Sequence, residues 1–255
     1  MEKGDFLMSE LQIIAKRDQK MVYRDGDKAV KVFESSFTKV NILNEALNQA
    51  RAEETGLNIP EILEVTKVDS KWAIVSEFAH GKTLEQLMQE HPDKLEEYMN
   101  LFVDLQLEMH SKKAPLLNKL KDKMIRKITA TGLDATVRYE LNTRLQGMPT
   151  HTKVCHGDFN PSNIIIDDSG KAAIVDWAHA TQGNASADTA NTYLYFALQN
   201  EEVAKLYMDL FCKKSDTAKQ YVEQWLPLVA ASRLTKGVEA EKEFLMKWID
   251  VCEYQ

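Results

Sequence analysis

A stretch near the middle of the chain carries the residues best suited to chemistry. It reads VCHGDFNPSNIII over residues 154–166, so polar side chains, Asp158 and Asn163 among them, lie between two apolar ends. Apolar ends of this kind are typical of buried strands, and burying a polar group is unfavourable unless a partner satisfies it. The pattern therefore indicates that these side chains have a partner or bind a ligand.

A predicted hairpin brings a second carboxylate to the same place. The sequence IIIDDSGKAAIVDW has two apolar runs around the turn-favouring residues DDSG. If Ile166 pairs with Lys171, then Asn163 and Asp176 lie diagonally on one face, within roughly 7–8 Å of each other. Asp158 precedes Asn163 by five residues. Three oxygen-bearing side chains then approach one volume, which suits a hard cation such as Mg²⁺.

These motifs resemble those of a known enzyme family. HGDFNPSN is similar to the H-G-D-x-x-x-x-N pattern of the aminoglycoside phosphotransferase and choline kinase-like family, and IVDW is similar to its metal-binding Asp motif. The spacing of Asp158 and Asp176 also resembles that of the H-R-D and D-F-G aspartates of protein kinases. The resemblance covers most of the chain and fades after Asn191.

The resemblance implies a phosphotransferase that uses ATP or GTP. It moves the γ-phosphoryl group to a hydroxyl of a small molecule such as an aminoglycoside, choline or a sugar. Asp158 is then the catalytic base, and Asn163 and Asp176 hold Mg²⁺ on the phosphates. These roles are also expected from the chemistry itself. Phosphoryl transfer requires a positioned hydroxyl, a proton acceptor and cations that offset the charge of the phosphates.

Further site residues follow from the same resemblance. Lys31, in AVKVF, matches the strand lysine that reaches the α- and β-phosphates, and Lys28, on the opposite face of the strand, is the alternative. The partner of this lysine is a helix glutamate. Glu45 fits best because it is in the middle of the helix, whereas Glu53 and Glu54 are in its last turn.

Two segments around the nucleotide are less well defined. VSEFAHG resembles the hinge, where backbone groups of roughly Glu77 to Ala79 hydrogen-bond adenine. The loop between the first two strands reads AKRDQKM and contains no glycine, although a glycine-rich loop often covers the phosphates in kinase-like folds. Backbone approach to phosphate is harder when Cβ atoms are present, so Arg17 or Lys20 is a candidate substitute.

Two polar residues near these motifs have alternative explanations. Asp188 matches a family position just past the metal aspartate, but a helix N-cap explains it equally well, so we leave it outside the site. His110 is expected to be a packed or capping histidine rather than a base.

The elements that position these residues follow from periodicity. LQIIAK, KMVYRD and KAVKVF read as strands, and a helix is expected over residues 38–55, ended by Gly56. Its expected apolar face carries Val40, Leu43, Ala46, Leu47 and Ala50. Two more strands precede a boundary near residues 78–81, and helices dominate from the capping-box sequence TLEQ onward. We therefore expect an α+β, two-lobed protein-kinase-like fold, with a β-rich N-lobe over 1–79 and a larger, mainly helical C-lobe over 80–255.

Composition and charge bound the class of protein. The 255 residues suffice for two lobes with a real core, and a formal net charge of −7 argues against a nucleic-acid binder. Three cysteines without paired spacing exclude a disulfide framework and fit a reducing compartment. We find no signal peptide and no run of 18 apolar residues, so a cytoplasmic protein without a membrane partner is expected. The oligomeric state stays open.

The acceptor is the least defined part of the prediction. A polycationic aminoglycoside needs an acidic cleft, for which Glu239, Glu241, Glu243 and Asp209 are candidates, although such charges more commonly lie on solvent-facing surfaces. Choline, a sugar, an amino alcohol or a modified nucleoside remains open, because a fold does not fix a substrate.

The alternative function is a catalytically inactive nucleotide-binding or scaffold protein, which the glycine-free loop favours and the intact HGD motif opposes. A protein kinase is disfavoured because no A-P-E segment follows.

Overall fold

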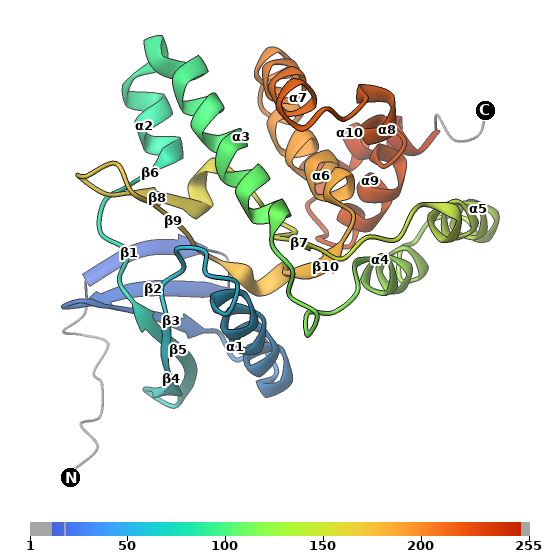
Figure 1. Cartoon of the computed structure of the whole chain (residues 1–255). Helices are drawn as coiled ribbons and strands as arrows, with labels where there is room; N and C mark the ends of the chain where they lie inside the picture. The colour runs from blue at the N-terminus through green and yellow to red at the C-terminus, as the bar shows by residue number, and fades with distance from the viewer. Residues whose placement is uncertain (1–11, 18, 251–255) are drawn as a thin grey trace. The chain divides into compact units, whose positions relative to one another are not determined.

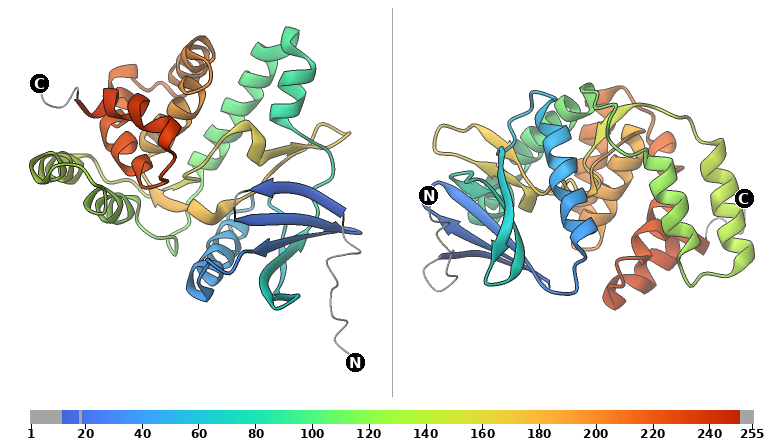
Figure 2. Two further views of the ribbon diagram at one scale, coloured as in Figure 1. Left: turned by 180° about the vertical axis from the view of Figure 1, so that it is seen from behind. Right: turned by 90° about the horizontal axis from the view of Figure 1, so that it is seen from below.

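The computed structural model describes residues 12–17 and 19–250, apart from the side chains of Arg17 and Asp250. The chain divides into two compact units. The first comprises residues up to Leu87 together with Ser162–His179, and the second comprises Met88–Pro161 and the residues from Ala180 onward. Figures 1 and 2 show the elements of both units in three views.

The first unit contains a five-stranded antiparallel sheet with strand order β1-β2-β3-β5-β4. The predicted strands are confirmed: they are β1 (Gln12–Arg17), β2 (Lys20–Asp25), β3 (Lys28–Phe33), β4 (Ile62–Val68) and β5 (Lys71–Glu77). Their β-branched and aromatic side chains suit a pleated, half-buried surface. One face buries a cluster made of Tyr23, Val30, Val32, Val68, Ala73 and Val75.

Helix α1 (Lys39–Glu53) packs beside this sheet, and the side chain of Thr38 caps its N-terminus. The helix is confirmed, but most of its predicted apolar face is wrong, because Ala46 alone of the five predicted residues is buried. Val40, Leu43 and Leu47 are exposed at 74%, 43% and 47%. The residues that this helix buries include two polar ones: Ile42, Glu45, Ala46, Asn48 and Ala52.

A three-stranded sheet also belongs to the first unit. It consists of β6 (Lys82–Thr83), β8 (Ile164–Ile166) and β9 (Ala172–Ile174), in the order β6-β8-β9. The predicted hairpin of β8 and β9 is confirmed, but its predicted register is wrong by one residue. Ile166 pairs with Ala172 rather than with Lys171.

The turn explains the difference in register. The Asp167 N–H donates to the Lys171 carbonyl oxygen over 3.1 Å, so Asp167 belongs to the ladder rather than to the loop. The loop then has three residues and ends on Gly170 at a φ of +84°, a left-handed conformation that glycine adopts without strain. At the other end of the ladder the Val175 N–H donates to the Asn163 carbonyl oxygen over 2.9 Å.

The capping box predicted at TLEQ is confirmed. The Thr83 N–H donates to Gln86 Oε1 over 2.9 Å, and the Gln86 N–H donates to Thr83 Oγ1 over 3.1 Å. This reciprocal pair satisfies two N–H groups at the start of α2 (Leu84–Glu90).

The second unit is mainly helical. A two-stranded sheet of β7 (Lys153–Cys155) and β10 (Thr181–Gly183) accompanies the helices. The helices are α3 (Leu95–Ser111), α4 (Leu120–Thr129), α5 (Ala135–Gly147), α6 (Ala185–Ala197), α7 (Glu201–Ser215), α8 (Lys219–Glu223), α9 (Leu226–Leu234) and α10 (Glu239–Asp250).

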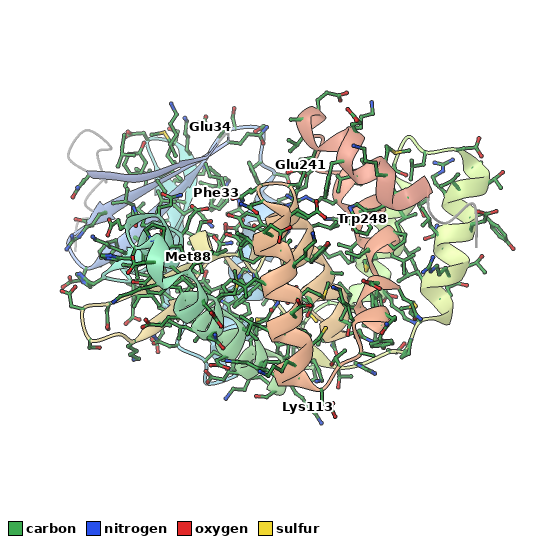
Figure 3. All side chains as sticks on the ribbon, turned by 90° about the horizontal axis from the view of Figure 1, so that it is seen from above. Phe33, Glu34, Met88, Lys113, Glu241 and Trp248 are labelled. Carbon is green, nitrogen blue, oxygen red and sulfur yellow. The ribbon has the colours of Figure 1, made fainter. Side chains whose placement is uncertain are left out.

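The core of the second unit joins its C-terminal helices to α4 and α5. Fully buried Trp225 lies in a cluster with Ile128, Leu145 and Leu194. At its edge Trp248 of α10, labelled in Figure 3, packs edge-to-face against Tyr193 with 5.9 Å between the ring centroids. Burial of these large side chains is the main force that holds the helices together.

The predicted fold class is confirmed, because a β-rich N-terminal sheet precedes a mainly helical C-terminal part. Among the described residues, no helix is long and apolar enough to cross a membrane.

Candidate active site

In the first unit, a lysine of β3 joins two carboxylates from distant parts of the chain. Lys31 Nζ lies 2.7 Å from Glu45 Oε1 and 2.9 Å from Asp176 Oδ1. Glu45 comes from the buried face of α1, and Asp176 follows β9. The sheet, the helix and the hairpin each supply one member, so the structure brings three of the predicted site residues together.

The two carboxylates hold Lys31 in its charged form. Burial alone would lower the pKa of Lys31, but the carboxylates of Asp176 and Glu45 outweigh burial, so its pKa is raised. Lys28, the alternative strand lysine, is exposed. A residue at this position that stays charged can contact phosphate oxygens as a fixed cation.

Lys20, a candidate to replace the missing phosphate-loop glycines, has a partner within the unit. Its Nζ lies 2.8 Å from Glu45 Oε2, so Glu45 receives one lysine on each carboxylate oxygen. The side chain of Arg17, the other candidate, lies outside the described residues.

The predicted metal ligands Asn163 and Asp176 flank the paired strands β8 and β9. Asn163 is buried and ends the short helical turn Pro161–Asn163 directly before β8. Asp176 has a φ of +65°, which is uncommon for a residue other than glycine. Amide and carboxylate oxygens are hard donors, and Mg²⁺ usually takes one or two protein ligands and completes its shell with phosphates and waters. This donor set therefore fits the ion.

At the predicted hinge, two backbone donors are already engaged within the first unit. The Glu77 N–H donates to the Glu61 carbonyl oxygen and the Phe78 N–H to the Asp27 carbonyl oxygen, each over 2.9 Å. The Glu77 carbonyl oxygen accepts from the Ser76 hydroxyl over 3.2 Å. Contacts of Glu77 and Ala79 with adenine therefore stay a prediction.

The second unit carries the predicted base, Asp158. Its Oδ1 accepts a hydrogen bond from Lys236 Nζ over 3.0 Å, and its side chain is 27% exposed. Asn160 Nδ2 donates to the Asp158 carbonyl oxygen over 2.9 Å, and the Asp158 N–H donates to Nδ1 of buried His156 over 3.3 Å. The carboxylate is thus reachable from solvent while its loop is fixed by side chains.

Asp188, which the sequence interpretation left outside the site, holds this loop. Its buried carboxylate accepts the N–H groups of His156 over 3.1 Å and of Gly157 over 2.7 Å, and it contacts His110 Nε2 at 3.1 Å. Burial would raise the pKa of Asp188, but the hydrogen bond and charge of His110 and the loop N–H groups outweigh it, so the pKa is lowered.

The N-cap interpretation of Asp188 is wrong. Helix α6 begins at Ala185, and its cap is Asn184, whose side chain accepts the Ser186 N–H over 3.0 Å. Asp188 therefore sits in the first turn of the helix, where the helix dipole also favours a negative charge.

The same helix supplies two more polar contacts to the loop. Asn191 Nδ2 donates to the Gly157 carbonyl oxygen over 3.1 Å, and Thr192 Oγ1 donates to the Phe159 carbonyl oxygen over 2.7 Å. With Asp188 these residues have the i, i+3, i+4 spacing that places side chains on one helix face. That spacing of three polar residues on one face of the predicted helix is the sequence signal that could have identified them.

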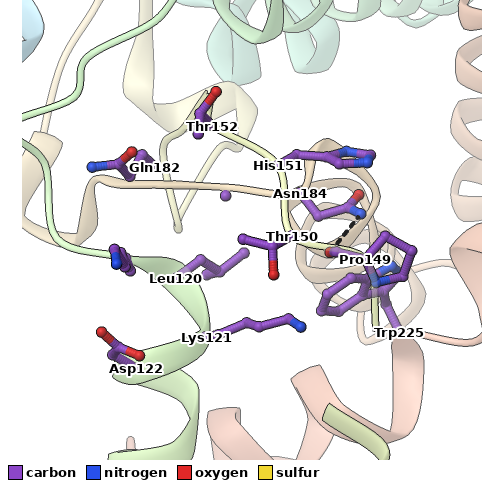
Figure 4. Close-up of a pocket in the computed structure, with 12 residues that line it drawn as sticks. Leu120, Lys121, Asp122, Pro149, Thr150, His151, Thr152, Gln182, Asn184 and Trp225 are labelled. Atoms are coloured by element: carbon purple, nitrogen blue, oxygen red, sulfur yellow. Dashed lines mark hydrogen bonds between the residues drawn. The ribbon is translucent and has the colours of Figure 1, made fainter. Parts of the chain in front are cut away.

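A cavity of about 250 Å³ lies elsewhere in the second unit, where α4 begins. Figure 4 shows it, with His151, Gln182 and Trp225 among its lining residues and the Asn184 amide directed to the Pro149 carbonyl oxygen. None of the predicted site residues lines this cavity, so it is not part of the candidate active site.

Comparison with known families identifies the class of protein. The sequence model of the APH phosphotransferase enzyme family matches residues 11–221. The chain therefore belongs to the phosphotransferase enzyme family. A comparison with curated proteins found no match.

Solved structures share the fold at low sequence identity. The apo form of a thermostable mutant of aminoglycoside phosphotransferase APH(4)-Ia is 15% identical with a TM-score of 0.69, covering 96% of this chain and 94% of that one. A ternary complex of such a mutant with AMP-PNP and hygromycin B is 16% identical with a TM-score of 0.69, at 96% and 93% coverage.

A further match lies outside the aminoglycoside enzymes. A choline/ethanolamine kinase family protein from Mesorhizobium loti is 16% identical with a TM-score of 0.59, covering 98% of this chain and 88% of that one. These likenesses establish the kinase-like α+β fold of this chain.

Proposed function

We propose that the chain is an ATP- or GTP-dependent phosphotransferase that moves the γ-phosphoryl group to a hydroxyl of a small molecule. The observation that carries the proposal is the position of Lys31 between Glu45 and Asp176. Family membership supports it, and AMP-PNP and hygromycin B in a structure of the same fold point to the same class of reaction.

In this proposal the first unit holds the nucleotide. Lys31 contacts the α- and β-phosphates, Glu45 orients Lys31, and backbone groups of Glu77 to Ala79 hold adenine. Asn163 and Asp176 hold Mg²⁺, which when bound offsets the charge of the phosphates. These residues lie in the expected nucleotide-binding lobe, 1–79, and in the hairpin of the same compact unit.

The second unit, which falls within the expected catalytic lobe 80–255, supplies the base. Asp158 takes the proton of the acceptor hydroxyl while the hydroxyl oxygen forms a bond to the γ-phosphorus. The bond from that phosphorus to the β-phosphate oxygen breaks, and the oxygen keeps the electron pair. The products are the nucleoside diphosphate and a phosphate monoester of the acceptor, and the proton stays on Asp158 until solvent removes it.

The test replaces the proposed base. Asp158→Asn is expected to lower kcat by about 10²–10⁴-fold, the usual contribution of a general base, while stabilisation by Mg-ATP in a thermal-shift assay persists. Asp104→Asn is the matched control, because Asp104 is an exposed carboxylate of α3. Unchanged turnover in Asp158→Asn would exclude this role.

The same experiment separates an enzyme from an inactive relative. If Mg-ATP stabilises the wild-type protein but no hydroxylated compound is phosphorylated, the nucleotide-binding scaffold that the glycine-free loop favours becomes the better description. Cytoplasmic location and the absence of nucleic-acid and membrane partners stay predictions.

A further inference from the structure

Two lysines act on the proposed base in the second unit, and a third lysine acts on both of them. Lys236, just after α9, donates to Asp158 over 3.0 Å. Lys127 of α4 is close enough to interact electrostatically with both Lys236 and Asp158. Lys123, one turn earlier on α4, interacts in the same way with Lys127 and Lys236. We call Lys123, Lys127, Arg233 and Lys236 the basic cluster.

The basic cluster is electrostatically unfavourable as it stands. Burial, and after it the charge of Lys127, lowers the pKa of Lys123 to about 7, and the Asp188 carboxylate offsets these effects only in part. Burial also lowers the pKa of Lys127, followed by the charge of Lys236, despite the opposing carboxylate of Asp158. A set of cations serving only as partners of carboxylates would have raised pKa values instead.

Arg233 adds a buried donor that lacks an acceptor. Its side chain is 7% exposed, and its Nε and Nη2 bind the Glu241 carboxylate over 2.6 and 2.8 Å. Its Nη1 is buried and finds no acceptor among the described residues. A buried unsatisfied donor is costly, and an oxygen of a bound anion would satisfy it.

The nearby acids do not balance the basic cluster. Three carboxylates bind or act on its members, namely Asp158, Asp188 and Glu241, and Asp188 is already engaged by His110 and the Asp158 loop. Arg126, on α4, adds one more positive charge that acts on Lys123. Among these named side chains the cations outnumber the carboxylates, although the whole chain is acidic.

The acidic residues that a polycationic acceptor would need are paired with cations. Glu241 binds Arg233, and Figure 3 labels Glu241 on α10. The other three bind lysines at 3.3–3.6 Å: Glu239 with Lys242, Glu243 with Lys247 and Asp209 with Lys219. Each of these carboxylates therefore has a cation beside it, which lessens the negative potential that it offers to an aminoglycoside.

We propose that the acceptor is a small hydroxylated anion, whose carboxylate or phosphate group binds the basic cluster while its hydroxyl meets Asp158. This inference rests on the proposed function and names its substrate class. An oxyanion would relieve the repulsion between the lysines and accept from Arg233 Nη1. The cations beside Asp158 would also offset the negative charge that grows during transfer to an anionic acceptor.

The test compares hydroxylated acceptors of similar size that differ in charge. Glucose, glucosamine and glucose 6-phosphate form one set, and glycerol, choline and glycerate form another. ADP release and the mass of the product are measured. An anionic member is expected to exceed its neutral counterpart in kcat/KM by at least tenfold, and the two sets distinguish a phosphate from a carboxylate. Preference for a neutral or cationic member would overturn the inference and leave the phosphotransferase function intact.

A variant connects that preference to the basic cluster. Lys127→Met is expected to raise KM for the anionic acceptor about tenfold or more, with KM for ATP unchanged. The matched control is Lys205→Met, at an exposed lysine of α7. Because Lys127→Met removes a repelled, largely buried charge, its Tm without added anion should not fall. An unchanged KM in a folded variant would contradict the inference.

A binding measurement covers the case in which the panel lacks the natural acceptor. Inorganic phosphate, at ionic strength held constant with chloride, is expected to raise the Tm of the wild type more than that of Lys127→Met. Equal shifts would overturn the inference. Failure of Mg-ATP to stabilise the protein would instead count against the proposed function, because the nucleotide is assigned to other residues.

Discussion

Asp188 Oδ1 accepts a hydrogen bond from the Gly157 N–H over 2.7 Å, although 31 positions separate the two residues in the chain. The carboxylate thus fixes the backbone next to the proposed base. We expect it to act as a positioning residue, because its buried charge has several donors directed at it.

Replacing this carboxylate tests the positioning role. Asp188→Asn is expected to lower the free energy of unfolding by about 2–4 kcal/mol, because hydrogen bonds to charged groups are worth about 1.5–3 kcal/mol each. In the folded fraction kcat should fall while KM for ATP changes little. Urea unfolding and steady-state kinetics measure both effects, and Asp104→Asn, with an exposed carboxylate, should show neither. A variant as active as wild type would show that the loop holds its geometry unaided.

Lys31 is expected to matter for the nucleotide rather than for the acceptor. Lys31→Met removes the cation between Glu45 and Asp176 and should lower kcat/KM for ATP by about 10- to 100-fold, given about 1.5–3 kcal/mol for a charge-assisted contact. Lys28→Met alters the exposed lysine of the same strand and should have little effect. The reverse result would favour Lys28 as the nucleotide lysine.

The lowered pKa of Lys123 predicts how stability depends on pH. Between the folded-state pKa of about 7 and the ordinary lysine value near 10.5, the unfolded chain binds more protons than the folded chain. Stability therefore rises as pH rises through this window. Lys127, whose pKa is also lowered, has the same sign. The raised pKa of Lys31 has no effect here, because its contribution is lost only above pH 10.5.

Urea unfolding at several pH values between 7 and 10 measures this effect. Lys123→Met should flatten the rise relative to wild type, and Lys205→Met should not, because Lys205 is an exposed lysine. An identical slope in all three proteins would mean that Lys123 titrates like an ordinary lysine.

Any side chain at Gly81 is expected to lower the stability of the protein, because of the backbone next to it. Its φ is +126°, and a Cβ built there would lie 2.0 Å from the carbonyl oxygen of Ile166 in β8. Gly81→Ala should lower the free energy of unfolding by about 1–3 kcal/mol, the usual range for such backbone strain. Gly132→Ala is the control, because nothing lies within 4 Å of its added Cβ. Equal stabilities would show that the backbone near Gly81 can shift without loss.

The strands and helix α1 could be predicted from the sequence because they depend on local patterns. The HGD motif could be recognised for the same reason. It missed the orientation of α1 because the prediction counted apolar residues only. The inward face contains Glu45 and Asn48, whose partners are Lys31 and the Ala178 carbonyl oxygen, residues remote in the chain. When polar residues of a helix have partners elsewhere in the fold, the buried face of the helix need not be its most apolar face.

The register of the β8–β9 hairpin was wrong for a different reason. Four turn-favouring residues suggested a four-residue loop, but the Asp167 carboxylate also accepts N–H groups of Ser169 and Lys171, which draws Asp167 into the ladder. Asp188 was undervalued because one aspartate in a predicted helix carries no sign of its partners. Two of those partners are backbone N–H groups, which have no signature in a sequence, and the third is His110, 78 positions away in the chain.

The first compact unit is assembled from two pieces of chain, one up to Leu87 and one over Ser162–His179. During synthesis these two pieces emerge at different times, because residues 88–161 are made between them. Strand β6 and Lys31 therefore lack their partners β8 and Asp176 until the second piece has been synthesised, and the unit cannot finish folding before then. Nascent chains stalled before residue 179 should accordingly remain protease-sensitive in their N-terminal portion, with a hydrophobic surface that needs chaperone protection.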